Sequence, residues 1–299
     1  MKERTPKKPN WDRVEGILTK EGRELLSRKN VAIIGVGSLG SEITRLLTMA
    51  GVGNFVLVDP DKLDESNVLR HWADLRDVGK FKVTAVKKLI KQRNPDVQVK
   101  TFPQDARINP CIFPGLDLAI ITGLGSNDAQ FQIAENTKQV GITTLATAIY
   151  NKGQGGEVFV VKPNEGPCYA CFSTYLNRSI NAEVRNGKIY CANVNPEQVP
   201  SFPALAVQIN RIATIAAEYA IELLKDSVTL KNSEKNLLIF SNTKLLLGKS
   251  AKDGHEIYLD PLRAVSYHIP KYPDCLVCGS YNILSDLTIE ELLTQKGGD

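Results

Sequence analysis

Four of the six cysteines form two closely spaced pairs, Cys168 with Cys171 and Cys275 with Cys278. Two residues separate the thiols of each pair, so two pairs can supply the four sulfur ligands of tetrahedral zinc. Four sulfur ligands leave no open coordination position, which predicts a structural ion that contributes folding energy. The alternative is a set of four reduced, buried cysteines. Zinc is favoured over disulfides because the chain is large and shows no secretory signal.

A second pattern with chemical use is the glycine motif of Gly35, Gly37 and Gly40. It follows an apolar run at residues 31–34 and precedes apolar residues at helical spacing, and a second apolar run then ends on Asp59. Such glycines let the backbone approach a phosphate at a helix N-terminus, where unpaired N–H groups favour negative charge. The motif in this context predicts a nucleotide site, whereas the glycines alone would also suit tight helix packing.

Polar residues near the ends of the expected strands indicate which nucleotide binds. Asn67, Arg70, Lys82 and Asp128 lie at or near loops that leave the sheet, and a parallel sheet binds ligands at its carboxyl edge. A dinucleotide is satisfied largely by the helix N-terminus, but a triphosphate favours several fixed cations and a carboxylate for magnesium. Each residue taken singly would suit a solvated surface position. Together, beside the glycine motif, they favour ATP with magnesium.

Composition and length set the frame for these sites. The chain of 299 residues is long enough for one large α/β domain or two small ones. No apolar run approaches the roughly 18 residues of a membrane span, and no hydrophobic segment follows the basic start. We therefore expect a cytoplasmic location and no membrane partner. A net charge of +4 with scattered lysines gives no reason to expect nucleic acid as a partner.

The apolar patterns predict a Rossmann-like α/β fold: a mostly parallel sheet with flanking helices, and a C-terminal antiparallel strand region tied back by the zinc site. Five segments are expected: a helical lead-in (1–28), a nucleotide-binding α/β core (29–171), a long polar crossover loop (172–203), a helix with antiparallel strands and the second cysteine pair (204–279), and a C-terminal helix or tail (280–299). The expected strands are residues 31–34, 55–58, 97–102, 116–122, 143–148, 155–161, 237–240, 244–247, 256–259 and 265–268.

Three segments and the cysteine pairs carry a resemblance to a known family. The segments are GVGSLGSE, LVDPDKLDESNVLRH and DVGKFKV, and the similarity runs from about Trp11 to Cys278. They resemble the ubiquitin-activating-enzyme-like adenylating proteins of the ThiF, MoeB and HesA type. The resemblance implies an adenylyltransferase, acting as a homodimer. It would use ATP and magnesium to adenylate the C-terminal glycine of a ubiquitin-like or sulfur-carrier protein.

The resemblance also implies roles for individual residues. It implies that the phosphates contact Gly35, Gly37, Gly40, Asn67 and Arg70. It implies that Asp59 binds the ribose, Lys82 the α-phosphate region and Asp128 magnesium. We include Asp61 among the cofactor-binding residues. Arg13 is similar to an N-terminal arginine that reaches the triphosphate of the partner subunit. One departure concerns Asp128, because TGLGSNDAQ replaces the family's DxTDN-like segment. Asp117 is a weaker substitute, since it begins its strand.

Cys191 lies in the long polar loop, where the family carries a cysteine that can form a thioester or persulfide-type link. A thiolate there could take the acyl group from the adenylate, and the alternative is an unreactive exposed cysteine. Cys111, beside apolar neighbours, is expected to be a buried structural thiol. His71 follows Arg70 and could line the nucleotide pocket, although a surface or packing role is the simpler expectation.

Three functional hypotheses remain. The first is adenylation of a ubiquitin-like protein, with transfer to Cys191 and a downstream conjugating enzyme. NVLRH resembles members that serve bacterial ubiquitin-like conjugation, and sulfur-carrier activation of thiamine or molybdopterin type is the runner-up. The second is an NAD-dependent oxidoreductase, which would explain the glycines and Asp59 but leaves the cations and cysteines unused. The third is a non-catalytic partner-binding scaffold, supported only by the altered segment before Asp128.

Overall fold

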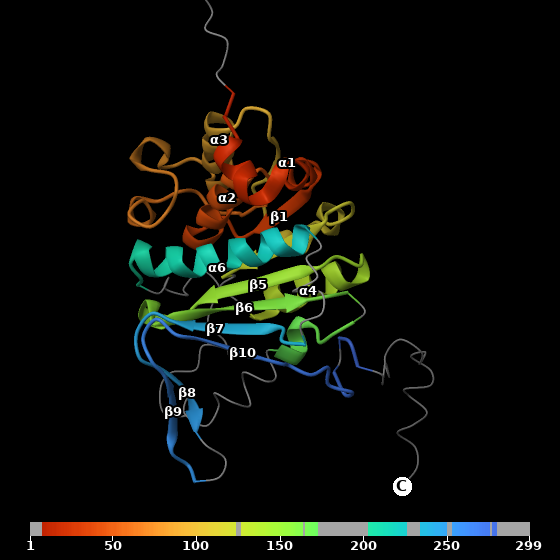
Figure 1. Cartoon of the computed structure of the whole chain (residues 1–299), viewed down its shortest axis with the longest axis vertical. Coiled ribbons are helices and arrows are strands. Elements are labelled where there is room, and N and C mark those ends of the chain that lie inside the picture. The colour runs from red at the N-terminus through yellow and green to blue at the C-terminus, as the bar shows by residue number, and fades with distance from the viewer. Residues whose placement is uncertain are drawn as a thin grey trace, which may run out of the picture.

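The computed structural model describes residues 8–123, 127–163, 165–172, 203–225, 234–249, 253–275 and 277–279. Its centre is an eight-stranded sheet with the order β10-β7-β6-β5-β4-β1-β2-β3, and β8 and β9 form a separate two-stranded sheet (Figure 1). The strands are β1 (Asn30–Ile34), β2 (Asn54–Val58), β3 (Gln98–Phe102), β4 (Leu118–Thr122), β5 (Thr144–Ile149), β6 (Gly155–Val161), β7 (Leu237–Ser241), β8 (Leu245–Lys249), β9 (Glu256–Leu259) and β10 (Ala264–Tyr267). The helices are α1 (Asp12–Arg28), α2 (Ser38–Ala50), α3 (Lys82–Arg93), α4 (Asn127–Gln139) and α6 (Ala206–Leu224), with short 3-10 turns that include η1 (Glu65–Asn67), η2 (Leu75–Asp77), η3 (Ala106–Ile108) and η4 (Pro110–Ile112).

The sheet is parallel from β3 through β2, β1 and β4 to β5. From there β6, β7 and β10 continue it with antiparallel pairings. This confirms the Rossmann-like architecture that the sequence predicts. Every expected strand is present, with ends that differ by at most two residues.

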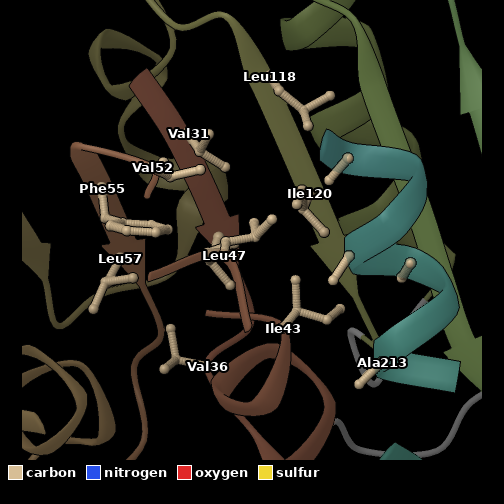
Figure 2. Close-up of a cluster of buried hydrophobic side chains, with 14 of the residues drawn as sticks. Val31, Val36, Ile43, Leu47, Val52, Phe55, Leu57, Leu118, Ile120 and Ala213 are labelled. Carbon is tan, nitrogen blue, oxygen red and sulfur yellow. The ribbon is translucent and has the colours of Figure 1, made fainter. Parts of the chain in front are cut away.

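Helices cover both faces of the sheet, as parallel strands require. On one face α2, α3 and α6 pack over a cluster that includes Val31, Phe55 and Ile120. Figure 2 shows Leu47 of α2 between these strand residues and Ala213 on the adjoining helix α6. On the other face Ile133 of α4 packs against a second buried cluster. The central strands are therefore buried on both sides, which explains their continuous apolar runs.

Helix α6 lies across the sheet beside α2 (Figure 1). Its buried side is rich in alanine, which lets the helix approach closely; these residues are Ala213, Ala216, Ala217 and Ala220. On β6, a Cβ atom on Gly156 would lie 2.9 Å from the Ile212 side chain. Small residues on both elements thus set the distance between helix and sheet.

Strand register places the nucleotide motif at the carboxyl edge of the sheet. Ile34 of β1 pairs with Val58 of β2 and with Ile121 of β4. The residues that follow these strands therefore meet at one edge, where parallel sheets bind ligands.

Parts of the sequence-based description remain predictions. The five-segment division is one of them, and residues 173–202 and 280–299 lie outside the described part of the chain. Within the described residues, no helix has both the length and the apolar character needed to span a membrane.

Candidate nucleotide site and cysteine cluster

The glycine loop, residues 35–37, joins β1 to α2. Gly35 has a φ of 91°, and its N–H donates to Val58 O at 2.9 Å. A Cβ atom on Gly40 would lie 1.9 Å from Gly35 O, so only glycine allows this approach. Gly37 instead opens onto empty space, since a Cβ atom there would meet nothing within 4 Å. The loop therefore presents accessible backbone at the N-terminus of α2, as an anion site requires.

Asp59 follows β2, and its carboxylate faces the glycine loop. Oδ2 accepts a hydrogen bond from Val36 N–H at 2.7 Å, and Oδ1 accepts one from Asp61 N–H at 2.9 Å. Burial raises the pKa of this carboxyl, an effect that the Lys82 ammonium partly offsets. Each carboxylate oxygen keeps a second lone pair. The predicted contact with a ribose is therefore compatible with these bonds and stays a prediction.

Lys82 begins α3 and brings a cation to the same edge of the sheet. Its Nζ lies 2.6 Å from Asp61 Oδ2, and its side chain is 12% exposed against 63% for the aspartate. The ammonium charge also contributes to lowering the pKa of the buried His71. Lys82 is linked to the glycine loop in steps: its ammonium pairs with Asp61, Asp61 N–H donates to Asp59, and Asp59 accepts from Val36 N–H.

The segment between Asp59 and α3 carries Asn67 and Arg70. Asn67 Oδ1 accepts a hydrogen bond from Asp64 N–H at 3.2 Å, which closes the η1 turn. Arg70 N–H donates to Asn67 O at 3.0 Å, so the two predicted phosphate residues share one turn. Both are half-buried. The next residue, His71, contacts the glycine loop and thereby places this segment beside it.

His71 is the residue whose place the sequence does not reveal. It is buried, with Nε2 2.9 Å from Val36 O, and Ala73 N–H donates to Nδ1 at 2.9 Å. Burial lowers the pKa of His71 to about 4, so the ring is neutral near pH 7. Its position directly after Arg70 is the only signal in the sequence that could have identified it.

Thr122 and Asp117 mark the two ends of β4. Thr122 Oγ1 donates to Gly35 O at 2.6 Å, so it belongs to the glycine loop's surroundings. Asp117 lies at the other end, where its Oδ2 accepts a hydrogen bond from Asn30 N–H at 2.7 Å and its Oδ1 lies 3.1 Å from Lys29 Nζ. Asp117 therefore lies at the edge of the sheet opposite the glycine loop, as expected for a weaker magnesium candidate than Asp128.

For three predicted site residues the structure does not show the expected contacts. Asp128 is the second residue of α4, which follows β4, but its side chain lies outside the described residues. Cys191 also falls outside them. Arg13 is exposed on α1, and its expected contact is with a partner subunit. The roles of all three stay predictions.

The paired cysteines converge into one cluster. Cys168 Sγ lies 3.6 Å from Cys275 Sγ, Cys171 Sγ lies 3.4 Å from Cys278 Sγ, and all four sulfurs lie within 4.8 Å of one another. Tetrahedral Zn–S bonds of about 2.3 Å correspond to sulfur separations of about 3.8 Å. Tyr272 N–H approaches Cys171 Sγ at 3.5 Å and supports the thiolate. The set of four sulfurs therefore fits zinc.

The cysteine cluster lies at the opposite edge of the sheet from the glycine loop. Val161 at the end of β6 pairs with Thr144 at the start of β5, and Cys168 follows soon after. Lys138, near the end of α4, donates from Nζ to Val277 O at 2.6 Å, between the cysteines of the second pair. The cluster thus ties the C-terminal segment to α4 and β6, which suits a structural role.

A cavity of about 280 Å³ borders the cluster and is lined by Lys138, Lys162 and Lys271. Its lining residues, all within the described ranges, include no Asp or Glu. Four thiolates around a divalent ion carry a net charge of −2, and nearby ammonium groups stabilise that charge.

The expectation that Cys111 is buried is wrong. The residue lies in η4 and is exposed. Its neighbours Ile112 and Phe113 occupy the buried positions instead, at 5% and 0% exposure. The apolar surroundings in the sequence therefore describe the residues after Cys111 and not the thiol itself.

Known proteins resemble this chain in both sequence and fold. Adenylyltransferase and sulfurtransferase UBA4 of Vanderwaltozyma polyspora is 26% identical over 228 residues, which cover 74% of this chain and 48% of that protein. Ubiquitin-like modifier-activating enzyme 5 of Culex quinquefasciatus is 26% identical over 161 residues, 50% of this chain and 41% of that protein. The chain spans about half the length, or less, of these curated relatives.

Among solved structures, E. coli MccB superposes with a TM-score of 0.66 at 16% identity, covering 93% of this chain and 74% of MccB. At this identity the likeness concerns the fold. The sequence comparison is more specific, because the profile of the ThiF family matches residues 12–255. The chain belongs to the ThiF family.

Proposed function

We propose that this chain is an ATP-dependent adenylyltransferase that activates the C-terminal glycine of a ubiquitin-like or sulfur-carrier protein. The observation that carries the proposal is the convergence of Lys82, Asp59 and the Arg70 segment on an open glycine loop. A fixed ammonium beside a helix N-terminus, with a second cation, Arg70, on the adjoining segment, suits a triphosphate better than a dinucleotide.

The similar proteins support the same activity. The names of the relatives, adenylyltransferase and ubiquitin-like modifier-activating enzyme, describe adenylation and the activation of ubiquitin-like modifiers. MccB, which shares the fold, has been solved with ATP and with MccA. We therefore propose ATP for the glycine loop and a carrier protein as the second substrate.

The chemistry needs charge stabilisation and no general base. A C-terminal carboxylate has a pKa of about 3.5, so it is already ionised near pH 7. One of its oxygens attacks the α-phosphorus of ATP, a carboxyl–phosphate bond forms, and the bond to the β-phosphate breaks to release pyrophosphate. We propose that Lys82 and Arg70 stabilise the charge that develops on the phosphate oxygens. Backbone N–H groups at Gly37 and the start of α2 would hold the phosphates.

Magnesium and the partner subunit complete the proposed site. Asp128 follows β4 closely and offers the carboxylate oxygen that magnesium prefers. A bound magnesium ion would neutralise charge on the leaving pyrophosphate. Arg13, exposed on α1, would reach the triphosphate of the second subunit in a homodimer.

The proposal has two versions, which differ in the reaction that consumes the adenylate. In the first version the Cys191 thiolate attacks the acyl carbon, AMP leaves, and the thioester passes to a downstream conjugating enzyme of a bacterial ubiquitin-like pathway. In the second the adenylate serves sulfur transfer, a version favoured by the relatives named adenylyltransferase and sulfurtransferase. A reducible conjugate with the carrier, lost in Cys191→Ser, would support the first version. Full carrier activation without any conjugate would support the second.

Exchange of labelled pyrophosphate into ATP tests the shared first step. The purified chain is incubated with ATP, magnesium, labelled pyrophosphate and a small protein ending in glycine that co-purifies with it. Exchange should appear only with the carrier and should vanish when its last glycine is removed. Absence of exchange, combined with a fluorescence change on adding NADH, would instead favour an oxidoreductase.

A further inference from the structure

The side chains of Asp59, His71 and Thr122 bind the two peptide groups of the glycine loop on either side of Val36. Val36 N–H donates to Asp59 Oδ2 at 2.7 Å, Val36 O lies 2.9 Å from His71 Nε2, and Gly35 O accepts from Thr122 Oγ1 at 2.6 Å. The Val36 side chain is itself fully buried and belongs to the hydrophobic cluster drawn in Figure 2. Both backbone polar groups of Val36, the Gly35 carbonyl and the Val36 side chain are thus all held by the surrounding protein.

We propose that His71 is a positioning residue that aims the glycine loop at the nucleotide phosphates and locks it to the Arg70 segment. This inference rests on the proposed function, because it concerns the same nucleotide site. It gives a specific role to a buried histidine that the adenylation chemistry itself does not use.

The hydrogen bonds of His71 fix its tautomer. Ala73 N–H donates to Nδ1 at 2.9 Å, so Nδ1 carries a lone pair and the ring proton lies on Nε2. Nε2–H is then the donor to Val36 O at 2.9 Å. An imidazolium could not accept from Ala73, and burial keeps the ring neutral by lowering the pKa of His71 to about 4.

The direction of Val36 O determines what the loop offers to a ligand. In a trans peptide the C=O and the following N–H point in opposite directions. Because His71 draws Val36 O toward the protein interior, Gly37 N–H points away from it. Gly37 is also the position where an added Cβ would meet nothing within 4 Å. The imidazole therefore aims the Gly37 N–H away from the interior, at a residue where the Cβ direction is open.

The same ring joins two parts of the site. Nε2 binds the glycine loop, while Nδ1 binds the backbone just after Arg70. A shift of the Arg70 segment would therefore move the glycine loop through the hydrogen bonds of this ring. His71 thereby sets the distance between the predicted phosphate cation and the backbone donors.

Two substitutions separate the donor role from simple packing. In His71→Gln the amide nitrogen can occupy the place of Nε2 and still donate to Val36 O. In His71→Asn the amide oxygen can replace Nδ1 as acceptor for Ala73 N–H, but the side chain is too short to reach Val36. His255→Asn, at an exposed histidine on the connection between β8 and β9, is the matched control.

The affinity for a non-hydrolysable ATP analogue is measured by calorimetry, and the melting temperature by thermal denaturation. Wild type, His255→Asn and His71→Gln should bind within about threefold of one another. His71→Asn should bind ~10- to 100-fold more weakly while melting close to His71→Gln, since misplacing a binding group costs this much.

The outcomes distinguish this inference from the proposed function. If wild type fails to bind the analogue, the proposed function is wrong. If wild type binds and His71→Asn binds equally well, the positioning role is wrong. Equal losses of affinity in both His71 variants would likewise overturn it, because a purely structural role predicts no rescue by glutamine.

Discussion

At the residue scale, Lys82 is the cation most firmly placed in the site. Its side chain is largely buried and its Nζ lies 2.6 Å from Asp61 Oδ2, so the protein holds the ammonium in position before any ligand arrives. A phosphate group near Lys82 would meet a charge that has already lost much of its hydration. Preorganised charges of this kind stabilise transition states most effectively.

Lys82→Ala and Arg70→Ala should each lower the rate of adenylation by roughly 10²- to 10³-fold, a typical loss for one preorganised charge partner. Lys80→Ala is the control, because Lys80 is an exposed lysine of the same segment whose Nζ lies 2.9 Å from Asp77 Oδ1. Pyrophosphate exchange measures all three rates. Near wild-type exchange in Lys82→Ala and Arg70→Ala would contradict the assignment.

Residue types indicated which side chains lie near the glycine loop better than they indicated the side chains that support the loop. Asp59 and Lys82 follow from the strand and helix pattern, because strand ends and helix starts meet at one sheet edge. His71 and Thr122 could not be found in this way, since their hydrogen bonds go to a backbone that only the folded chain brings near. The prediction that Cys111 is buried was wrong for a similar reason. The direction of the Cys111 side chain depends on a 3-10 turn that the apolar pattern does not define.

At the element scale, two glycines of the motif serve different purposes. Gly40→Ala would place a Cβ 1.9 Å from Gly35 O and should destabilise the protein by about 1–3 kcal/mol, an ordinary cost of overpacking. Gly37→Ala adds a methyl group in open space and should lower stability less.

Gly37→Ala should nevertheless weaken ATP binding roughly 10- to 100-fold, because the methyl group would occupy the place of a phosphate hydrogen-bonded to the backbone. Calorimetry with an ATP analogue and chemical denaturation measure the two effects. If Gly37→Ala binds like wild type, phosphate does not approach the loop at this residue.

Strand β6 carries a buried carboxyl that makes stability depend on pH. Tyr150 OH donates to Glu157 Oε2 at 2.7 Å, and burial raises the pKa of Glu157 to about 7 from 4.5. The folded state therefore binds more protons than the unfolded state between these values. Stability should fall as pH rises from about 4.5 to about 7, by up to roughly 3 kcal/mol.

Glu157→Gln should remove this dependence, because the amide keeps an oxygen acceptor for Tyr150 and does not ionise. The variant should be more stable than wild type at pH 8 and should differ little near pH 4.5. Denaturation midpoints across this range provide the measurement. An unchanged pH profile in the variant would show that another group is responsible.

The strands were predictable because each is an apolar run bounded by turn residues, and the Rossmann-like pattern indicated a mostly parallel sheet but not the order of its strands. The face on which each helix packs was not predictable from periodicity. Alanines of α6 gave little sign that this helix lies against α2, since small residues suit any close contact. Tertiary fit, which no local pattern encodes, decided that arrangement.

At the scale of the whole molecule, the nucleotide site and the cysteine cluster occupy opposite edges of one sheet. The cluster joins the segments around Cys168 and Cys275, which are 107 residues apart in the sequence. Closing so long a loop restricts the unfolded chain strongly. The C-x-x-C spacing predicted this closure correctly, but not its distance from the glycine loop.

The purified chain should contain about one zinc ion, and Cys278→Ser should lose it. Loss of the metal should lower the melting temperature on the order of 5 °C or more, equivalent to about 2 kcal/mol for a domain of this size. Cys111→Ser is the control and should keep both metal and stability. Metal analysis and thermal denaturation test this. A metal-free chain with the wild-type melting temperature would contradict a structural zinc.

The central claim is that a carrier carboxylate attacks the α-phosphorus of ATP at the glycine loop. Tracing oxygen tests it directly: the carrier's C-terminal carboxylate is labelled with ¹⁸O, incubated with the chain, ATP and magnesium, and the acyl group is released with hydroxylamine. The account predicts AMP carrying one ¹⁸O atom and unlabelled pyrophosphate, with little product from Lys82→Ala. Formation of ADP, or AMP without label, would contradict it.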